Sequence, residues 1–379
     1  ACVFFDKPSP LPKEILMRSL VKTIMVLSLF ALSFCPAAFA QDLPVIRVGY
    51  IFTTNHTPFM AAMAQGKDLT VDGYSLSPII PKEKYELLKD GTPIAMLDIL
   101  VAKSGSETST LFAQNHLDMA LCSITAILSG IDKGVPMKIV SPVVLASGGL
   151  VVLNDSPVNS WADFAAAAKA AKTPLKVGYH SPNSAPIIIL EAAMRSEGLV
   201  VSSDPNNTEA QVVLVDLKGT TNMLPALASK QVDAVVGPEP FPQTAVFKKT
   251  GRIVEELRTM PPSGKWQEYP CCVVTASDAM IAKNPGLVRD FAHFISAANT
   301  WCNANLEKAG VLGAGWIGLP EEVGKMQRLR FLSSFTDNWK QGANGYLEVL
   351  NKAGYFKGGL KDKDFSQAES LLVDYGFLQ

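Results

Sequence analysis

The chain has 379 residues, with 34 lysines and arginines against 35 aspartates and glutamates and a formal net charge of −1. This balance lacks the basic excess of nucleic-acid-binding proteins, so we expect no nucleic acid among the partners. The length exceeds what a single hydrophobic core usually serves, which predicts two lobes.

Residues 18–40 have the pattern of a secretory signal. Arg18 and Lys22 supply positive charge ahead of an apolar run from Thr23 to Phe34. That run is shorter than the roughly 20 apolar residues that a membrane-spanning helix needs. The run is followed by Ala38–Ala40, which has the small-x-small form of a cleavage site.

The signal predicts export to the periplasm with cleavage after Ala40. We therefore treat residues 1–40 as an N-terminal extension and signal peptide, outside the folded protein. A lipid anchor on Cys35 is the alternative. Phe34 disfavours it, because a small residue is expected next to a modified cysteine.

The first element after the signal is an apolar run, Val45–Tyr50, which predicts a buried parallel strand. A helix is expected next, with Thr57 as its N-cap and Pro58 at its first position. A strand that leads into a helix N-terminus presents free N–H groups where open α/β sheets bind ligands. We therefore expect Asn55, His56 and Thr57 to line a small-molecule site. The alternative is an ordinary connection with His56 in solvent.

The same order of strand, turn and helix recurs along the chain, which predicts an α/β fold. Further strands are expected at Leu97–Ala102, Leu117–Leu121, Met137–Val144, Leu150–Leu153, Leu175–Tyr179, Val212–Leu217, Val232–Val236 and Tyr269–Val274. Helices are expected at Pro58–Gln65, Thr108–Asn115, Ile124–Ile131, Trp161–Ala171, Ala185–Glu197, Met223–Ser229, Pro285–Asn305, Pro320–Leu329, Trp339–Ala353 and Phe365–Tyr375. Most of the segment 67–101 shows no clear pattern.

Five turns of this series are rich in serine, threonine and asparagine, and each follows a strand and opens a helix. Small polar side chains with exposed backbone N–H groups suit an anion or a compact polar molecule. N-capping explains any one turn, but five on one sheet edge favour a binding cleft. The expected ligand contacts are Asn55, His56, Thr57, Ser104, Ser106, Ser123, Thr125, Ser181, Asn183, Ser184, Thr220 and Thr221.

Glu239 is a further candidate, because it lies between two prolines directly after a predicted buried strand. Its carboxylate either accepts an N–H from a ligand or fixes a hinge, and the sequence leaves both interpretations open.

No pattern of a catalytic or metal centre is present. The sequence lacks G-x-S-x-G, a P-loop and a G-x-G-x-x-G after a strand, and the four histidines lack metal-ligand spacing. We therefore expect no catalytic residue, no metal and no cofactor. The cysteines of the mature chain form either one disulfide, such as Cys302 with Cys271 or Cys272, or buried free thiols, which would then include Cys122.

Several of these stretches carry a resemblance to a known family. They are Arg47–Tyr50 with Asn55–Phe59, Leu117–Ala120, Lys176–Tyr179, and Leu224–Leu227 with Gln231–Ala234, followed by Glu239-Pro240. The chain resembles ABC-transporter substrate-binding proteins of the nitrate/sulfonate/taurine group, which includes binders of thiamine-pyrimidine precursors.

This resemblance implies a two-lobed type II periplasmic binding fold, each lobe a mostly parallel sheet flanked by helices, with two crossover strands. The lobes would be residues 43–152 plus 270–379 and residues 153–269. It also implies a monomer that captures a sulfonate, nitrate or a small heterocycle and delivers it to an ABC permease in the inner membrane.

The chain departs from the family pattern in two ways. The segment 67–101 is longer than usual, and no basic residue can be placed in the cleft, whereas Asn55–Thr57 is closer to the pyrimidine-precursor binders. Two alternatives therefore stay open. One is an enzyme on the same fold related to thiamine-pyrimidine synthesis, against which the export signal argues. The other is a periplasmic sensor module.

Overall fold

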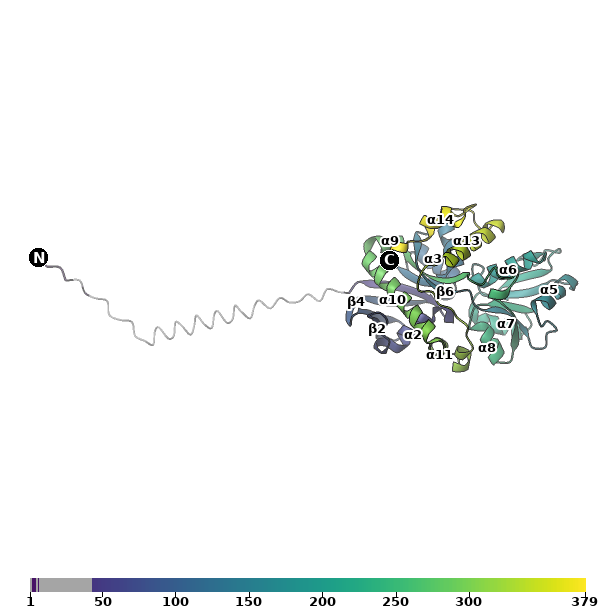
Figure 1. Cartoon of the computed structure of the whole chain (residues 1–379), viewed down its shortest axis with the longest axis horizontal. Coiled ribbons are helices and arrows are strands. Elements are labelled where there is room, and N and C mark those ends of the chain that lie inside the picture. The colour runs from purple at the N-terminus through teal and green to yellow at the C-terminus, as the bar shows by residue number, and fades with distance from the viewer. Residues whose placement is uncertain (1, 5, 7–42) are drawn as a thin grey trace. The chain divides into compact units, whose positions relative to one another are not determined.

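The structure, a computed structural model, describes residues 2–4, 6 and 43–379. The predicted signal peptide, its cleavage site after Ala40 and Cys35 lie outside the described residues. Residues 43–379 belong to one unit, which contains two β-sheets with helices around them (Figure 1). None of the described helices is long and apolar enough to cross a membrane.

The first sheet has seven strands in the order β2-β3-β4-β1-β5-β13-β6. Their bounds are β1 Val45–Ile51, β2 Tyr74–Ile80, β3 Lys84–Lys89, β4 Thr92–Ala102, β5 Met119–Ser123, β6 Met137–Leu145 and β13 Pro270–Ser277. The central strand β1 runs parallel to β4 and β5, and its Ile46, Val48 and Tyr50 are fully buried. The predicted buried parallel strand is therefore confirmed.

Two groups of helices cover this sheet. The first group is α2 Thr57–Gln65, α10 Pro285–Ala304 and α11 Leu306–Trp316, which pack on one another. Phe59 of α2 meets Phe291 and Phe294 of α10 edge to face, with ring centroids 5.7 and 6.4 Å apart. The second group is α3 Gly105–Ala113, α4 Ile124–Asp132, α13 Asp337–Lys352 and α14 Phe365–Leu372.

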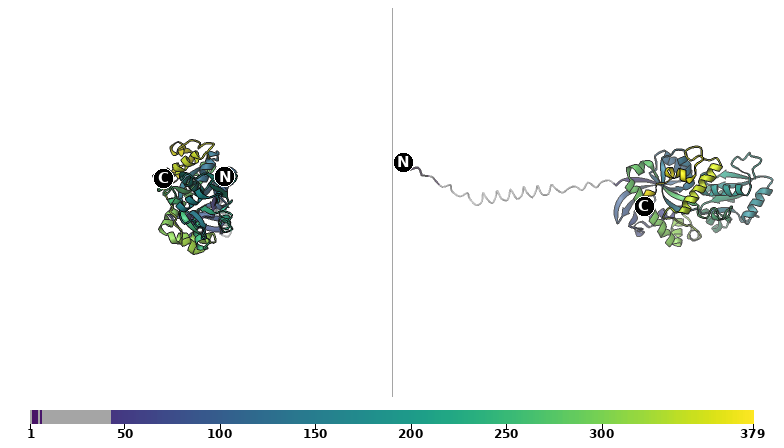
Figure 2. Two further views of the ribbon diagram at one scale, coloured as in Figure 1. Left: turned by 90° about the vertical axis from the view of Figure 1, so that its right-hand side faces the viewer. Right: turned by 45° about the horizontal axis from the view of Figure 1, so that its top comes forward.

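The second sheet has six strands in the order β12-β7-β11-β8-β10-β9. Their bounds are β7 Gly149–Leu153, β8 Leu175–Tyr179, β9 Val201–Ser202, β10 Val212–Asp216, β11 Ala234–Gly237 and β12 Gly251–Glu256. The helices near it are α5 Trp161–Ala170, α6 Ala185–Ser196, α7 Met223–Ala228 and α8 Phe241–Phe247. This part of the molecule is teal in Figures 1 and 2 and lies away from β2 and β4.

The remaining described elements are short. They are α9 Asp278–Lys283 and α12 Glu321–Lys325, together with the 3-10 turns η1 Thr54–His56, η2 Gly66–Asp68, η3 Thr220–Asn222, η4 Leu257–Thr259 and η5 Tyr375–Phe377.

The predicted α/β class is confirmed, but the first sheet is mixed and not mostly parallel. Strand β13 runs antiparallel to both β5 and β6. The segment 67–101 supplies β2, β3 and all of β4 except its last residue, and the pairs β2-β3 and β3-β4 are antiparallel. In β3 the buried Tyr85 and Leu87 alternate with the less buried Lys84 and Glu86, a period of two that identifies the strand in retrospect.

The chain passes from the first sheet to the second between β6 and β7, and it returns between β12 and β13. Strand β7 pairs with β11 and β12 in the second sheet. A lobe boundary at residue 152 would divide this strand. The division into lobes 43–152 plus 270–379 and 153–269 stays a prediction.

Candidate functional site

A small cavity lies between the two sheets where β1 leads into α2 and β8 leads into α6. Its volume is about 30 Å³, which is room for about two water molecules. We call it the inner cavity. Its lining comes from both sheets and consists of Ile51, Thr53, Asn55, His56, Ser123, His180, Ser184, Pro186, Thr220, Pro238, Cys271 and Cys272.

Asn55 is held rigidly at the wall of this cavity. Its side-chain amide donates to the Cys271 sulfur at 3.2 Å, and its Oδ1 accepts from the Ser147 hydroxyl at 3.0 Å. The residue is only 1% exposed. Two partners from separate segments therefore fix the amide orientation before any ligand arrives.

His56 is fully buried, and its two ring nitrogens have different roles. Its Nδ1 accepts the Ile51 backbone N–H at 3.1 Å, so the proton of the neutral ring is on Nε2. The buried Nε2 has no hydrogen-bond partner among the described residues. Burial lowers the pKa of His56 to about 3. The ring is thus a neutral donor whose N–H lacks an acceptor.

His180 follows β8 and faces the same cavity from the second sheet. Burial lowers its pKa to about 4, and its buried Nδ1 has no partner among the described residues. His56 and His180 therefore line one cavity, each from a different sheet. Both rings are neutral at pH 7, so neither supplies positive charge to a ligand.

The cysteines at this site are thiols. Within the described part of the chain, Cys122, Cys271, Cys272 and Cys302 are all buried and free, so the free-thiol alternative holds there. The Cys271 and Cys272 sulfurs lie 3.7 Å apart. The hydrogen bond with Cys271 and burial raise the pKa of the Cys272 thiol well above its usual range, so it is a poor nucleophile.

Several hydrogen bonds join segments of the two sheets and their helices around the inner cavity. The Ser106 and Ser181 hydroxyls lie 3.1 Å apart, and the Thr125 hydroxyl donates to the Asn183 carbonyl at 2.7 Å. The Thr53 hydroxyl donates to the Glu239 carbonyl at 2.7 Å. These contacts hold the sheets closed over the cavity.

The turn residues predicted to bind ligand fall into three sets. Asn55, His56, Ser123, Ser184 and Thr220 line the inner cavity. Ser104, Ser106 and Ser181 line a second hollow of about 320 Å³, which we call the outer pocket and which shares His180 with the inner cavity. Thr57, Thr125, Asn183, Thr221 and Glu239 line neither, and Thr221 is exposed.

The predicted capping role of Thr57 is wrong. The Thr53 hydroxyl accepts the Asn55 N–H at 3.4 Å and opens the turn η1, which continues directly into α2. Thr57 is therefore already inside a helical segment. Its buried hydroxyl has no partner among the described residues and lies beside Gly313 of α11, where a side chain would collide with it.

Glu239 joins the second sheet to the segment after α12. Its carboxylate accepts the Arg328 backbone N–H at 3.1 and 3.3 Å from its two oxygens, and its carbonyl accepts from Thr53. Burial raises the pKa of Glu239 to about 7. All of these contacts are made within the protein, and the predicted ligand contact of Glu239 stays a prediction.

Several residues that line the cavity or contact its lining were not among the sequence candidates. Thr53, Ser147 and the cysteine pair Cys271-Cys272 position or border Asn55. Thr53 precedes Asn55 by two residues, the spacing of a hydroxyl that caps a turn, so this signal was present. The contacts of Ser147 and Cys271 depend on tertiary structure.

No group of three histidines, cysteines or carboxylates that could hold a metal occurs among the described residues.

Comparison with solved structures shows the fold. The ligand-binding component of an ABC-type import system from Staphylococcus aureus matches with a TM-score of 0.65 and 12% identity, over 88% of this chain and 98% of that one. The periplasmic nitrate-binding protein NrtA from Synechocystis matches with a TM-score of 0.62 and 13% identity, over 87% and 85%. The periplasmic aliphatic sulphonate binding protein SsuA from Escherichia coli matches at 0.59 and 14%, over 89% and 100%.

Sequence comparison gives the family. An uncharacterized protein from Methanocaldococcus jannaschii is 28% identical over 120 residues, which cover 31% of this chain and 82% of that protein. The model of the NMT1-like family matches residues 40–313, which include β1, the inner cavity and both crossings between the sheets. The two-sheet fold and this match over most of the chain agree with the resemblance seen in the sequence, and the chain belongs to the NMT1-like family.

Proposed function

We propose that the protein is the exported solute-binding component of an ABC importer. It captures one small polar molecule between two lobes, residues 43–152 plus 270–379 and residues 153–269, and delivers it to a permease in the inner membrane. The observation that carries the proposal is the inner cavity. Buried polar groups from both sheets converge there, and His56 Nε2 and His180 Nδ1 lack partners among the described residues. Unpaired buried polar groups are costly, and a ligand between the sheets would satisfy them.

The chemistry of the lining narrows the solute class. No lysine or arginine is among the described residues that line the cavity, and both histidines are neutral because burial lowers their pKa values. The site therefore offers hydrogen bonds without a counter-charge, which supports an uncharged polar heterocycle more than a sulfonate or nitrate. A volume of about 30 Å³ is too small for such a molecule, so binding requires the lobes to separate by hinge motion.

The same groups weaken the enzyme alternative. A histidine with a pKa of about 3 is too weak a base to take a proton efficiently at neutral pH. Cys272, whose thiol pKa is raised, is likewise a poor nucleophile. Solute capture does not require either group to react. The three solved structures compared above are named as a ligand-binding component of an import system and as periplasmic binding proteins.

Native mass spectrometry of the purified mature protein tests the proposal. We expect one small molecule per chain, released unchanged on denaturation and lost from the His56→Ala variant. Thr57→Val is the matched control, because Thr57 is adjacent in sequence but does not line the cavity. Recovery of a chemically altered molecule, or equal retention by His56→Ala, would contradict capture at this site.

A further inference from the structure

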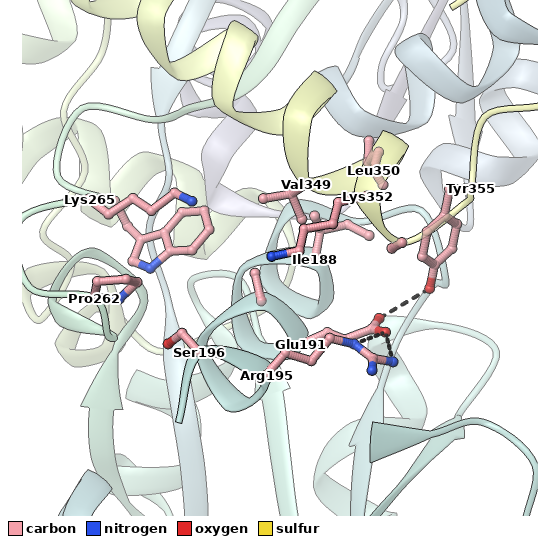
Figure 3. Close-up of a pocket in the computed structure, with 13 residues that line it drawn as sticks. Ile188, Glu191, Arg195, Ser196, Pro262, Lys265, Val349, Leu350, Lys352 and Tyr355 are labelled. Carbon is pink, nitrogen blue, oxygen red and sulfur yellow. Dashed lines mark hydrogen bonds and ion pairs between the residues drawn. The ribbon is translucent and has the colours of Figure 1, made fainter. Parts of the chain in front are cut away.

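A larger pocket lies outside the inner cavity, between α6, the loop 262–266 and α13 with the residues that follow it. We call it the side pocket (Figure 3). Its volume is about 590 Å³ and it shares no lining residue with the inner cavity. This volume is within the range of sites that hold small organic molecules, roughly 300–1,000 Å³.

The inner surface of the side pocket is apolar. Its accessible apolar side chains include Ala192 of α6, Val349 of α13 and Tyr355, which is 43% exposed. Ile188 and Leu350 also border it but are only 2% and 4% exposed. Trp266 borders it from the loop and is fully buried, and its indole N–H donates to the Pro261 carbonyl at 2.8 Å, which fixes the ring. An alkyl or aryl group placed here would remove apolar surface from water and would contact apolar side chains.

One charged group at the pocket is already neutralised. Glu191 accepts from the Arg195 guanidinium at 2.8 and 3.1 Å and from the Tyr355 hydroxyl at 3.1 Å (Figure 3). This carboxylate and Arg195 therefore satisfy each other, and neither supplies net charge to an occupant.

Two lysines at the pocket have no such partner. Figure 3 shows the side chains of Lys265 and Lys352 directed toward the hollow from opposite sides. Neither forms an ion pair with a carboxylate of residues 43–379. The Lys265 ammonium lies 4.9 Å from the centre of the Trp266 ring, above the apolar surface. The pocket thus combines an apolar wall with two cations.

We propose that the side pocket binds an amphipathic carboxylate, with its apolar body against Ala192, Val349 and Tyr355 and its carboxylate between Lys265 and Lys352. Charge-assisted hydrogen bonds to the two ammonium groups fix the polar end. Helix α6 packs against the second sheet and α13 against β13 of the first sheet, so the occupant contacts both lobes. It therefore favours the arrangement of lobes that forms the pocket.

Isothermal titration calorimetry with octanoate tests the proposal on the full mature protein. Octanol supplies the apolar body without the charge, and acetate supplies the charge without the body. We expect one octanoate per chain, and binding of octanol and acetate at least about tenfold weaker, because each lacks one of the two interactions.

Variants locate the site. Lys265→Met and Lys352→Met should each weaken octanoate binding about three- to tenfold, and the double variant should abolish it. Lys169→Met, on the exposed surface of α5, is the matched control and should bind like wild type. Absence of octanoate binding at millimolar concentration, equal binding of octanol, or undiminished binding by the double variant would overturn the proposal.

Discussion

His56 and Thr57 are adjacent in the chain but face different surroundings. The η1 turn directs His56 into the inner cavity, whereas Thr57 begins α2 and lies against α11. The turn opens at Thr53, and its geometry places the side chain of His56, and not that of Thr57, at the cavity. A substitution at each position separates a ligand contact from a packing contact.

We expect His56→Ala to weaken solute binding by about 1–3 kcal/mol, since it removes a buried donor and leaves the ligand acceptor unpaired. Thr57→Val should leave the dissociation constant unchanged, because the hydroxyl that it removes has no partner among the described residues. Calorimetric titration of both variants with the solute released from wild type checks this. Equal dissociation constants for wild type and His56→Ala would remove His56 from the site.

Glu239 makes the stability depend on pH. Burial raises its pKa from 4.5 to about 7, so between these values the folded protein holds a proton that the unfolded chain has released. The associated stability is present below pH 4.5 and is lost as the pH rises to about 7.

The variant Glu239→Gln keeps the shape of the side chain but cannot ionise. Between pH 4.5 and 7.5, the free energy of unfolding of wild type should fall relative to this variant by about 2–4 kcal/mol. Urea unfolding at four pH values measures the difference. A difference that stays constant over the range would show that Glu239 titrates normally in the folded protein.

At the scale of elements, the C-terminal helices depend on close backbone approach. Gly310 of α11 lies directly against the backbone of Gly324 in α12, where a Cβ has no room. Gly315, in the same helix, has open space around it and is exposed. The two positions therefore form an internal comparison.

Gly310→Ala should destabilise the protein by about 1–3 kcal/mol, because α11 and α12 must move apart. Gly315→Ala should be neutral or stabilising by up to about 1 kcal/mol, because alanine favours the helical backbone. Thermal unfolding of both variants checks the pair. Equal destabilisation by the two changes would contradict the close packing of these helices.

The elements that the sequence predicted are those with strong local patterns. The β-branched runs of β1 and β10 and the amphipathic α10 carry their patterns in nearby residues. Helix α11 was missed because Gly310, Gly313 and Gly315 weaken its helical signal, and packing on α2 and α12 compensates. Strands β9 and β12 were missed as well, and β9 has only two residues.

The site could be predicted only in part, because some of its contacts join residues that lie far apart in the sequence. Asn55, His56 and Ser184 follow strands, so local order placed them at the sheet edge. The contact of Cys271 with Asn55 joins residues 216 positions apart, and the link from Glu239 to Arg328 joins residues 89 apart. No local pattern encodes such distances.

At the scale of the whole molecule, the structure is a closed arrangement of two sheets. Hydrogen bonds from Thr53, Ser106 and Thr125 span the gap, and the cavity that they close holds no more than about two water molecules. A solute must therefore bind while these contacts are open and then be enclosed. The free energy of its contacts with both sheets would add to the stability of the closed form.

The central claim is that a small polar solute binds between the sheets at His56. A thermal-shift screen of pyrimidines, sulfonates, nitrate and aromatic acids tests it most directly, with wild type, His56→Ala and Thr57→Val measured side by side. We predict that at least one solute raises the Tm of wild type and of Thr57→Val by mass action, and that the shift is lost in His56→Ala. A screen without any shift, or a shift retained in full by His56→Ala, would contradict the account.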